Sequence, residues 1–577
     1  MTVMRMGEAV RKILPVIAML IGAVALFIGI GQKTFWAPPE TVTATMPEFD
    51  GSAPLTVIEP SINDADIAPV ELQIESEGEF TASLGRSYDV EAWVGDAKHV
   101  SLTGIDRENH RLQAELVDGK AEVPNPAGGD IFFDSQQADG KMTYRWTAPD
   151  SGSWSLLLAA DGKQAAPAKI SVTYANTATM PWALPLIIVG SLLIVVGLAF
   201  LLVRPAAKRP ARRVNTHNSL ALVAALSLGL SGVLIPAAPS DESASPKDAE
   251  SATPSEQASD AAAEQSASTT PEEQTATTFP VVTEEQLNRI LEDVKKQVGK
   301  ADDSHNAKDL DGRTAGAFKS IRSSRYEILK KDVKVAEPTK LATDVIRSAA
   351  VPNTSEAKFP RVINVVTAKD QDPNTLPIAI TLRQENARDN YKVVFASQML
   401  PGASFPGIAV GDPSVKQLGA DAEGLNTKPQ DAMNQLADVL TNPKSKQAGK
   451  FAESEFIKAV HAGQKSEKDK ANEADVKYER KPSAKDTTVL STPDGGAIVT
   501  GLINSTTTFK RTEDSDPLKG ADELTRKLLG SSSSTGDVQI RYAEPVMFYI
   551  PAGDSKDKIS LIAGEVVLLD VKQVKEN

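Results

Sequence analysis

Histidines are the first candidates for acid–base or metal chemistry in this chain. There are five, His99, His110, His217, His305 and His461. A zinc site needs several ligands at characteristic spacing, and none of these residues has a second histidine at such a spacing. We therefore expect each histidine to be a surface or packing residue.

A run of acids could instead suggest calcium. It comprises Asp302, Asp303, His305, Asp309, Asp311 and Gly312. An EF-type loop that includes Asp309-x-Asp311-Gly312 would need an acid at position 307 and a glutamate at 318, but the chain has Ala307 and Phe318. A polar turn between two helices explains the run better.

Two further patterns could carry enzymatic chemistry. Ser355-Glu-Ala-Lys358 has the Ser-x-x-Lys spacing of penicillin-binding enzymes, but it lies beside Pro360 and the companion motifs are missing. Asp309-Leu-Asp311 and Asp514-Ser-Asp516 have the letters of a metal-dependent glycosyl transfer site, in segments that do not read as a Rossmann-like fold. We predict no catalytic, cofactor-binding or metal-binding residue, and we favour a protein that is not an enzyme.

Composition excludes other chemistry. The 577 residues include no cysteine, which rules out disulfides, thiolate catalysis and Cys-ligated zinc. A net charge of −14 argues against a nucleic-acid partner, which would need a basic face. The chain also lacks a P-loop and a G-x-G-x-x-G motif, so we expect no nucleotide partner.

The elements that position these residues begin with uncharged apolar runs. Residues 13–32 and 181–203 are each long enough to span a bilayer as a helix, and we predict two transmembrane helices there. A third run, residues 219–238, is weaker because it is rich in Ala, Ser and Gly. It reads either as a third transmembrane helix or as an internal signal-like segment that is cleaved.

Flanking charges predict the orientation of these helices. Arg5, Arg11 and Lys12 precede the first run, and a basic loop at 204–218 follows the second. Lysine and arginine accumulate on the cytoplasmic side, so residues 1–12 and 204–218 should be cytoplasmic. The interface and topology residues are Trp36, Trp182, Arg204, Lys208, Arg209, Arg212 and Arg213. The predicted location is a multi-pass plasma-membrane protein with most of the chain outside the cytoplasm.

Residues 33–180 show a period of two. Alternation at Val70 to Ile74, Tyr88 to Val94 and Ile170 to Tyr174 is typical of half-buried strands. Asp-Gly pairs at 118–119, 139–140 and 161–162 suit tight hairpins. We therefore predict an all-β, antiparallel sandwich without a helix, in which Trp93, Trp146 and Trp154 are core or sheet-face residues.

The remainder reads as a linker followed by an α+β region. Residues 239–280 are acidic and poor in apolar side chains, so we predict a disordered tether that lifts the last domain off the membrane. Residues 281–577 contain a faint repeat with a shift near 145 residues. We predict two tandem units, 281–425 and 426–577, each with two helices followed by strands.

The repeat is carried by matching signals. Thr283-Glu-Glu-Gln286 has the spacing of a capping box and precedes an apolar helical face from Leu287 to Val298. Thr427-Lys-Pro-Gln430 repeats that start before a face from Met433 to Leu440. Helices at 314–329 and 451–462 follow, then strands at 362–366 and 497–503, and the segment from Tyr391 parallels that from Tyr542.

Two resemblances follow from these patterns. The order of helices and strands in each tandem unit resembles the cone-shaped nuclear-transport-factor-two-like and cystatin-like domains. Thr34-Phe-Trp36-Ala-Pro-Pro-Glu40, with Asp89-Val-Glu-Ala-Trp93 after it, resembles a group of actinobacterial membrane proteins of unknown function. Some members of that group carry an automatic glycosyltransferase label. The resemblance implies a location in the cell envelope rather than a reaction.

Our leading hypothesis is a non-catalytic binding or scaffold protein of the cell envelope, with the membrane and other envelope proteins as partners. An enzyme, or an accessory subunit, for envelope glycan or lipid assembly is the alternative. A lipid carrier is a third possibility, so the ligand could be a lipid or a glycan. A buried Asp, His or Tyr in a cone-fold cavity would favour the enzyme, whereas a cavity filled by apolar side chains would favour the scaffold.

Overall fold

A computed structural model describes residues 2–48, 51–63, 70–146, 151–176, 178–202, 277–331, 333–471, 474–512, 517–520 and 522–574, with side chains from residue 13 onward. The chain divides into two compact units, residues 1–38 with 178–274, and residues 39–177 with 275–577. The basic loop 204–218, the third apolar run 219–238 and residues 239–276 of the expected linker lie outside the described residues. Predictions for them therefore stay predictions.

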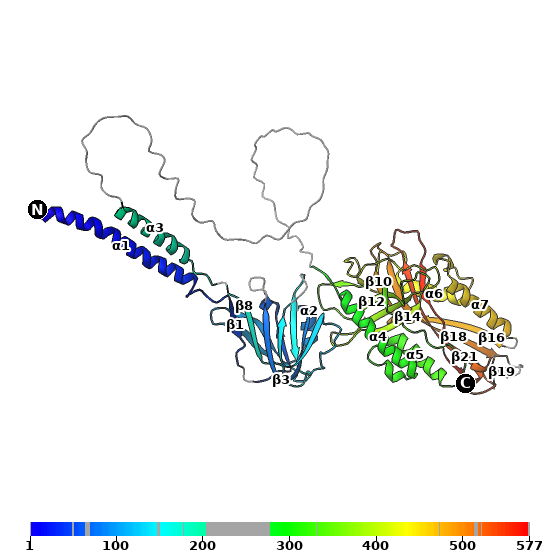
Figure 1. Cartoon of the computed structure of the whole chain (residues 1–577). Coiled ribbons are helices and arrows are strands. Elements are labelled where there is room, and N and C mark those ends of the chain that lie inside the picture. Colours follow the sequence, from blue (N-terminus) through cyan, green and yellow to red (C-terminus); the bar gives the residue numbers. More distant parts are fainter. Residues whose placement is uncertain are drawn as a thin grey trace, which may run out of the picture. The chain divides into compact units, whose positions relative to one another are not determined.

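The first unit contains two helices that are long and apolar enough to cross a membrane, α1 (Thr2–Lys33) and α3 (Ala183–Leu202). They lie side by side along their length (Figure 1). Glycines permit the close contact: an added Cβ at Gly22 would lie 2.8 Å from the carbonyl oxygen of Gly190, and one at Gly29 would lie 2.9 Å from that of Ala183. Small residues at such contacts are typical of packed membrane helices.

Residues 39–177 of the second unit form a closed, barrel-like sheet. Its eight strands follow the order β6-β3-β7-β2-β4-β5-β1-β8 (Figure 1). Strand β8 pairs back with β3, which closes a ring of seven strands, and β6 pairs with β3 outside that ring. The strands are β1 (Thr41–Thr45), β2 (Leu55–Ile58), β3 (Glu71–Arg86), β4 (His99–Asp106), β5 (Arg111–Val117), β6 (Asp134–Arg145), β7 (Trp154–Ala159) and β8 (Lys169–Ala175). A short 3-10 helix, η1, spans Pro60–Asn63.

The predicted antiparallel sandwich is therefore wrong in topology. Strand β2 pairs parallel with β4, and β1 pairs parallel with β5. The long strand β3 closes the ring because it changes partner along its length, pairing with β8 through Glu71–Glu75 and with β7 through Thr81–Arg86. The alternation that predicted strands at residues 70–74 and 170–174 is confirmed, and the three predicted core tryptophans are buried.

A helix replaces one predicted strand. Residues Ser87–Val94 form α2, with Val90, Trp93 and Val94 buried on one face. The spacing i, i+3, i+4 of these apolar residues fits a helix as well as their alternation fits a strand. Of the Asp-Gly pairs, 139–140 lies inside β6 opposite an irregularity in β3, where Gly140 has φ +76°, and 161–162 lies in the connection between β7 and β8.

The first tandem half begins with an N-cap that the sequence predicted. In α4 (Glu284–Ser304) the Thr283 hydroxyl accepts from the Gln286 backbone and the Gln286 side chain accepts from the Thr283 backbone, so the capping box is confirmed. Helix α5 (Gly316–Leu329) follows a short helix, η2 (Ala307–Leu310). The sheet order is β10-β12-β13-β14, with β10 (Val345–Ala350), β12 (Arg361–Ala368), β13 (Ile378–Gln384) and β14 (Lys392–Gln398). Strand β9 (Phe279–Pro280) pairs with β11 (Asn353–Thr354), so the last residues of the expected linker are structured.

The second half repeats two helices and a sheet. Helix α6 (Pro429–Thr441) has Pro429 in its first turn and no side-chain cap at Lys428, so the predicted capping box at Thr427 is wrong. Helix α7 spans Glu455–Lys470. The sheet contains β15 (Gln417–Leu418), β16 (Ala474–Pro482), β17 (Thr488–Ser491), β18 (Ala497–Arg511), β21 (Val538–Ile550), β22 (Ser560–Gly564) and β23 (Val567–Gln573). The remaining elements are η3 (Ala448–Lys450), η4 (Ala484–Asp486), β19 (Leu518–Lys519), α8 (Glu523–Leu529) and β20 (Ser533–Ser534).

Both halves share an order of elements, with one correction to the predicted repeat. Strand β18 lies between β16 with β17 on one side and β21 on the other, as β12 lies between β10 and β13. By sheet order β21 therefore corresponds to β13, and the predicted match between the segments at Tyr391 and Tyr542 is wrong. Each half has an apolar core between its helices and sheet, built in the first half by side chains such as Leu291 and Ile380 and in the second by Leu436 and Phe548.

The closed sheet and the tandem halves are docked through buried ion pairs. The Asp89 carboxylate of α2 accepts from both terminal nitrogens of Arg361, and both side chains are almost fully buried. Asp130 accepts from Arg313 and from the backbone of Tyr391, at 2.8 Å in the latter case. Residues 39–177 and 275–577 thus form one compact unit.

Candidate functional site

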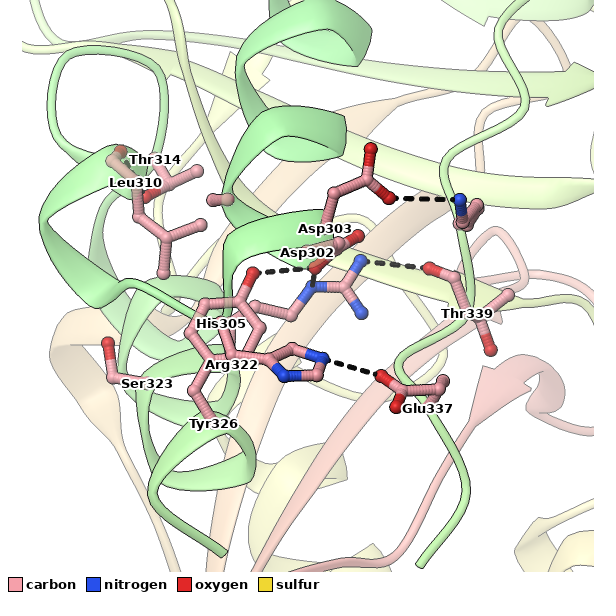
Figure 2. Close-up of polar contacts among 12 residues, drawn as sticks. Asp302, Asp303, His305, Leu310, Thr314, Arg322, Ser323, Tyr326, Glu337 and Thr339 are labelled. Carbon is pink, nitrogen blue, oxygen red and sulfur yellow. Dashed lines mark hydrogen bonds and ion pairs between the residues drawn. The ribbon is translucent and has the colours of Figure 1, made fainter. Parts of the chain in front are cut away.

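A buried polar cluster lies where the end of α4 meets α5 (Figure 2). The Tyr326 hydroxyl donates to Asp302 Oδ1 over 2.6 Å, and Arg322 Nε lies 3.3 Å from the same oxygen. Arg322 and Tyr326 are four residues apart on α5, so both side chains project from one face of the helix toward α4. The cluster therefore ties the two helices together.

Burial dominates the electrostatics of this cluster. It raises the pKa of Asp302, against the opposing effects of Arg322 and of the Tyr326 hydrogen bond. It lowers the pKa of Arg322 and raises that of Tyr326 far above its ordinary value. Asp302 Oδ2 is buried without a hydrogen-bond partner. Because Tyr326 holds its proton so firmly, it cannot serve as a base near neutral pH.

His305 borders the cluster without joining a catalytic relay. It ends α4 with φ +48°, and its Nε2 lies 2.9 Å from Glu337 Oε2. Its ring lies 5.7 Å from that of Tyr326, whereas Asp302 accepts a hydrogen bond from Tyr326 and forms an ion pair with Arg322 (Figure 2). The described contacts of His305 include no hydroxyl nucleophile, so these residues do not form the linked nucleophile, base and orienting group of a triad.

A cleft adjoins the cluster. It has a volume of about 420 Å³ and lies between α5, β14 and the turn from β22 to β23. Its apolar lining includes Phe318, Leu341, Ile378, Phe395 and Met399, and its charged lining residues are Arg322, Arg325, Glu337 and Glu565. Pockets of about 300–1,000 Å³ with apolar walls and a few polar groups are typical of small-ligand sites. Binding is therefore the chemistry that this geometry supports.

Each of the other described histidines has its own local environment. His99 Nδ1 lies 2.9 Å from the carbonyl oxygen of Ala97, and His461 Nε2 lies 2.8 Å from that of Val439. His110 has a positive φ in a turn, and His217 lies outside the described residues. Within the described ranges, no group of three or more His, Asp or Glu side chains is arranged to hold a metal ion.

The remaining motif residues are held by local contacts. Lys358 forms an exposed ion pair with Glu356 at 2.7 Å, and no contact links it to Ser355. Asp309 accepts from Lys300, Ser304 and Asn306, whereas Asp311 pairs with Lys319. Asp302 and Asp303 of the run belong to the end of α4, and only residues 305–312 form a polar turn between α4 and α5. The second Asp-x-Asp pair, 514–516, lies outside the described residues.

Of the predicted topology residues, the two tryptophans are described. Trp36 folds back over Gly31 and meets the Phe27 ring edge to face at 6.2 Å, while Trp182 precedes α3 and is exposed. The five cations from Arg204 to Arg213 lie outside the described residues.

Sequence reasoning missed the residues that the tertiary structure pairs. Asp89 and Arg361 are 272 residues apart, and Asp130 and Arg313 are 183 apart, so no local spacing could indicate either pair. Asp302 was considered for calcium, but its partners on α5 were not foreseen. Only the i, i+4 spacing of Arg322 and Tyr326 on an expected helix hinted at a shared partner.

Comparison with known proteins identifies only a family for this chain. No curated protein and no solved structure matches it. The resemblances to cone-shaped domains and to actinobacterial envelope proteins therefore stay expectations. One family model, described as a domain of unknown function, matches residues 278–570, just over half of the chain and nearly all of the tandem halves. The chain belongs to this family, DUF8094.

Proposed function

We propose that this chain is a membrane-anchored, non-catalytic binding or scaffold protein that works outside the cytoplasm. The observation that carries the proposal is that apolar side chains fill the interior of both tandem halves. The space between helices and sheet, where a cone-shaped domain would enclose a substrate, is packed with side chains such as Leu291, Val365 and Phe548. Such packing favours a binding surface over an internal active site.

The buried charges support the same interpretation. Asp89 pairs with Arg361, Asp302 with Arg322, and Glu544 with Arg480 at 2.8 Å. A catalytic acid or base must reach its substrate, whereas these carboxylates are covered and held by arginines. Their arrangement supports a structural role. The partners that we propose are other envelope proteins, or a lipid or glycan of the envelope.

Membrane anchoring through α1 and α3 is supported by their length and apolar composition. In the proposed topology residues 1–12 and 204–218 are cytoplasmic and the docked unit lies outside. Reporters fused after Ala44 and after Ser240 should indicate a location outside the cytoplasm, and a reporter fused near Arg212 should indicate the cytoplasm. An outside signal at Arg212 would overturn this topology.

Complementation of a deletion strain tests the absence of catalysis. Asp302→Asn, His305→Ala and Glu337→Gln, made one at a time, should each restore cellular function to the wild-type level. Removal of residues 277–577 should abolish function while the membrane segment still inserts. If one of these conservative variants matched that truncation at unchanged protein level, the scaffold proposal would fail and an enzyme of envelope glycan or lipid assembly would replace it.

A further inference from the structure

The cleft beside α5 shares one turn of its wall with a second cleft. Gly564 and Glu565, in the turn from β22 to β23, line both the cleft of about 420 Å³ and a neighbouring cleft of about 470 Å³ along α7. The second cleft is bordered by Phe456, Val460 and Val566. The two clefts thus meet at one turn, between the second helix of each tandem half.

Each of these two clefts is lined by one exposed apolar side chain. In the described parts of residues 39–176 and 277–574, the large apolar side chains that are exposed are Leu376, at 40%, and Val566, at 42%. Leu376 lines the first cleft and Val566 lines the second. A single exposed apolar side chain is ordinary, but here one lines each of the two clefts that share the turn from β22 to β23.

One cation in the cleft wall lacks a partner. Arg325 is half-buried, and within the described part of the chain its side chain has no ion pair or hydrogen bond. The neighbouring Arg322 is engaged by Asp302 and by the carbonyl oxygen of Thr339, to which it donates over 2.8 Å. Glu337 lies against His305, and Glu565 is exposed to solvent. Arg325 is therefore free to receive an anion.

We propose that the cleft beside α5 binds a single-chain amphipathic anion, an acyl chain that ends in a carboxylate or a phosphate. The chain would lie along the wall formed by Phe318, Phe395 and Met399, and the head group would pair with Arg325. An apolar tail and one charged head match an apolar wall with one unpaired guanidinium. This inference rests on the proposed binding function and names its ligand class.

Photo-crosslinking of the full chain in lipid nanodiscs tests the assignment. The probe is a diazirine-bearing palmitic acid, and labelled peptides are located by mass spectrometry. Labelling should occur in residues 317–325 and 394–401, in addition to the membrane helices. Arg325→Gln should raise the half-saturating probe concentration for the cleft peptides about 10- to 150-fold, the loss expected for a hydrogen bond to a charged group.

Matched variants and probes separate the possible outcomes. Lys330→Gln removes the same charge near the end of α5, outside the cleft lining, and should leave labelling unchanged. Leu376→Glu places a negative charge at the rim and should weaken labelling without disturbing the core. Competition by palmitate or by lysophosphatidic acid distinguishes a carboxylate from a phosphate head group, and competition by either supports the proposal.

Two results would overturn it. Equal labelling by the acid and its methyl ester would assign the cleft to an uncharged apolar occupant, such as a segment of a partner protein. Labelling confined to the membrane helices would show partition into lipid only. If the cleft stays unlabelled while removal of residues 277–577 still abolishes cellular function, this inference fails and the proposed binding function stands.

Discussion

Substitution of Asp89 by alanine should separate the closed sheet from the tandem halves. The change removes both hydrogen bonds to Arg361, whose side chain is only 2% exposed. A guanidinium buried without its anion costs about 3–5 kcal/mol, which lowers the docking equilibrium constant by about 100- to 4,000-fold. The apolar contacts of Phe359 and Ala387 with this junction would remain.

The assay needs a chain that can be cut between the docked regions. A protease site is inserted after residue 250, the N-terminus carries an affinity tag, and the cleaved protein is held on a resin in mild detergent. Wild-type protein should retain its C-terminal fragment through extended washing. The Asp89→Ala variant should release it, and the released fraction after dilution gives the change in docking strength.

Two control variants test whether the loss of docking comes from the unpaired buried charge. Lys141→Ala breaks an exposed ion pair with Glu75 and should change docking by less than about 1 kcal/mol. The double variant Asp89→Leu with Arg361→Met leaves no unpaired charge and should recover most of the retention. If Asp89→Ala retained its fragment as firmly as Lys141→Ala does, the buried pair would not hold the junction and our reasoning would be refuted.

Three further predictions concern the helices. Gly190→Leu should disrupt the α1–α3 pair, since even a Cβ would lie 2.6 Å from the backbone nitrogen of Leu26; cross-linking between the helices should fall, and unchanged cross-linking would contradict the packing. Gln286→Ala should lower the free energy of unfolding by about 1–2 kcal/mol, because it removes half of the capping box and a 3.0 Å hydrogen bond to the Asp130 carbonyl; a loss below about 0.5 kcal/mol would contradict this. Burial raises the pKa of Asp302 above its ordinary value near 4. The stability that this group contributes is therefore fully present at a pH below its ordinary pKa and is lost as the pH rises through the raised pKa. Thermal melts of Asp302→Asn between pH 4 and 7 should therefore show a smaller fall in stability than wild type, and identical pH profiles would show that Asp302 does not titrate there.

Local signals predicted the elements whose residues interact within a few positions. The capping box at Thr283 and the apolar face of α4 depend on backbone geometry within one or two helical turns, and both were confirmed. The strands predicted at 362–366 and 497–503 are confirmed as parts of β12 and β18, and every residue of both ranges is buried, as is typical of short apolar runs in the interior of a fold. The predicted capping box of α6 is absent because Pro429 lies in the first turn of that helix and Lys428, rather than Thr427, is its N-cap residue.

Where a segment fits both a strand pattern and a helix pattern, its neighbours in the tertiary structure decide which secondary structure forms. Residues 87–94 fit a strand by alternation and a helix by the spacing of Val90, Trp93 and Val94. Arg388 donates to the carbonyl oxygens of Trp93 and Val94, each over 2.7 Å, and so satisfies the end of the helix. A partner almost 300 residues away thus completes this helix, and no local pattern could reveal it.

The sequence by itself determined that the chain carries long uncharged apolar runs, no cysteine chemistry and a C-terminal region of helices followed by strands. Those properties depend on composition and on periods of two or 3.6 residues. Only the tertiary structure decided which strands close the first sheet, which carboxylates pair with Arg313, Arg322 and Arg361, and that Arg325 stays unpaired beside an apolar cleft. Pairing across hundreds of residues depends on which surfaces bury each other, and burial is a property of the folded chain rather than of any segment.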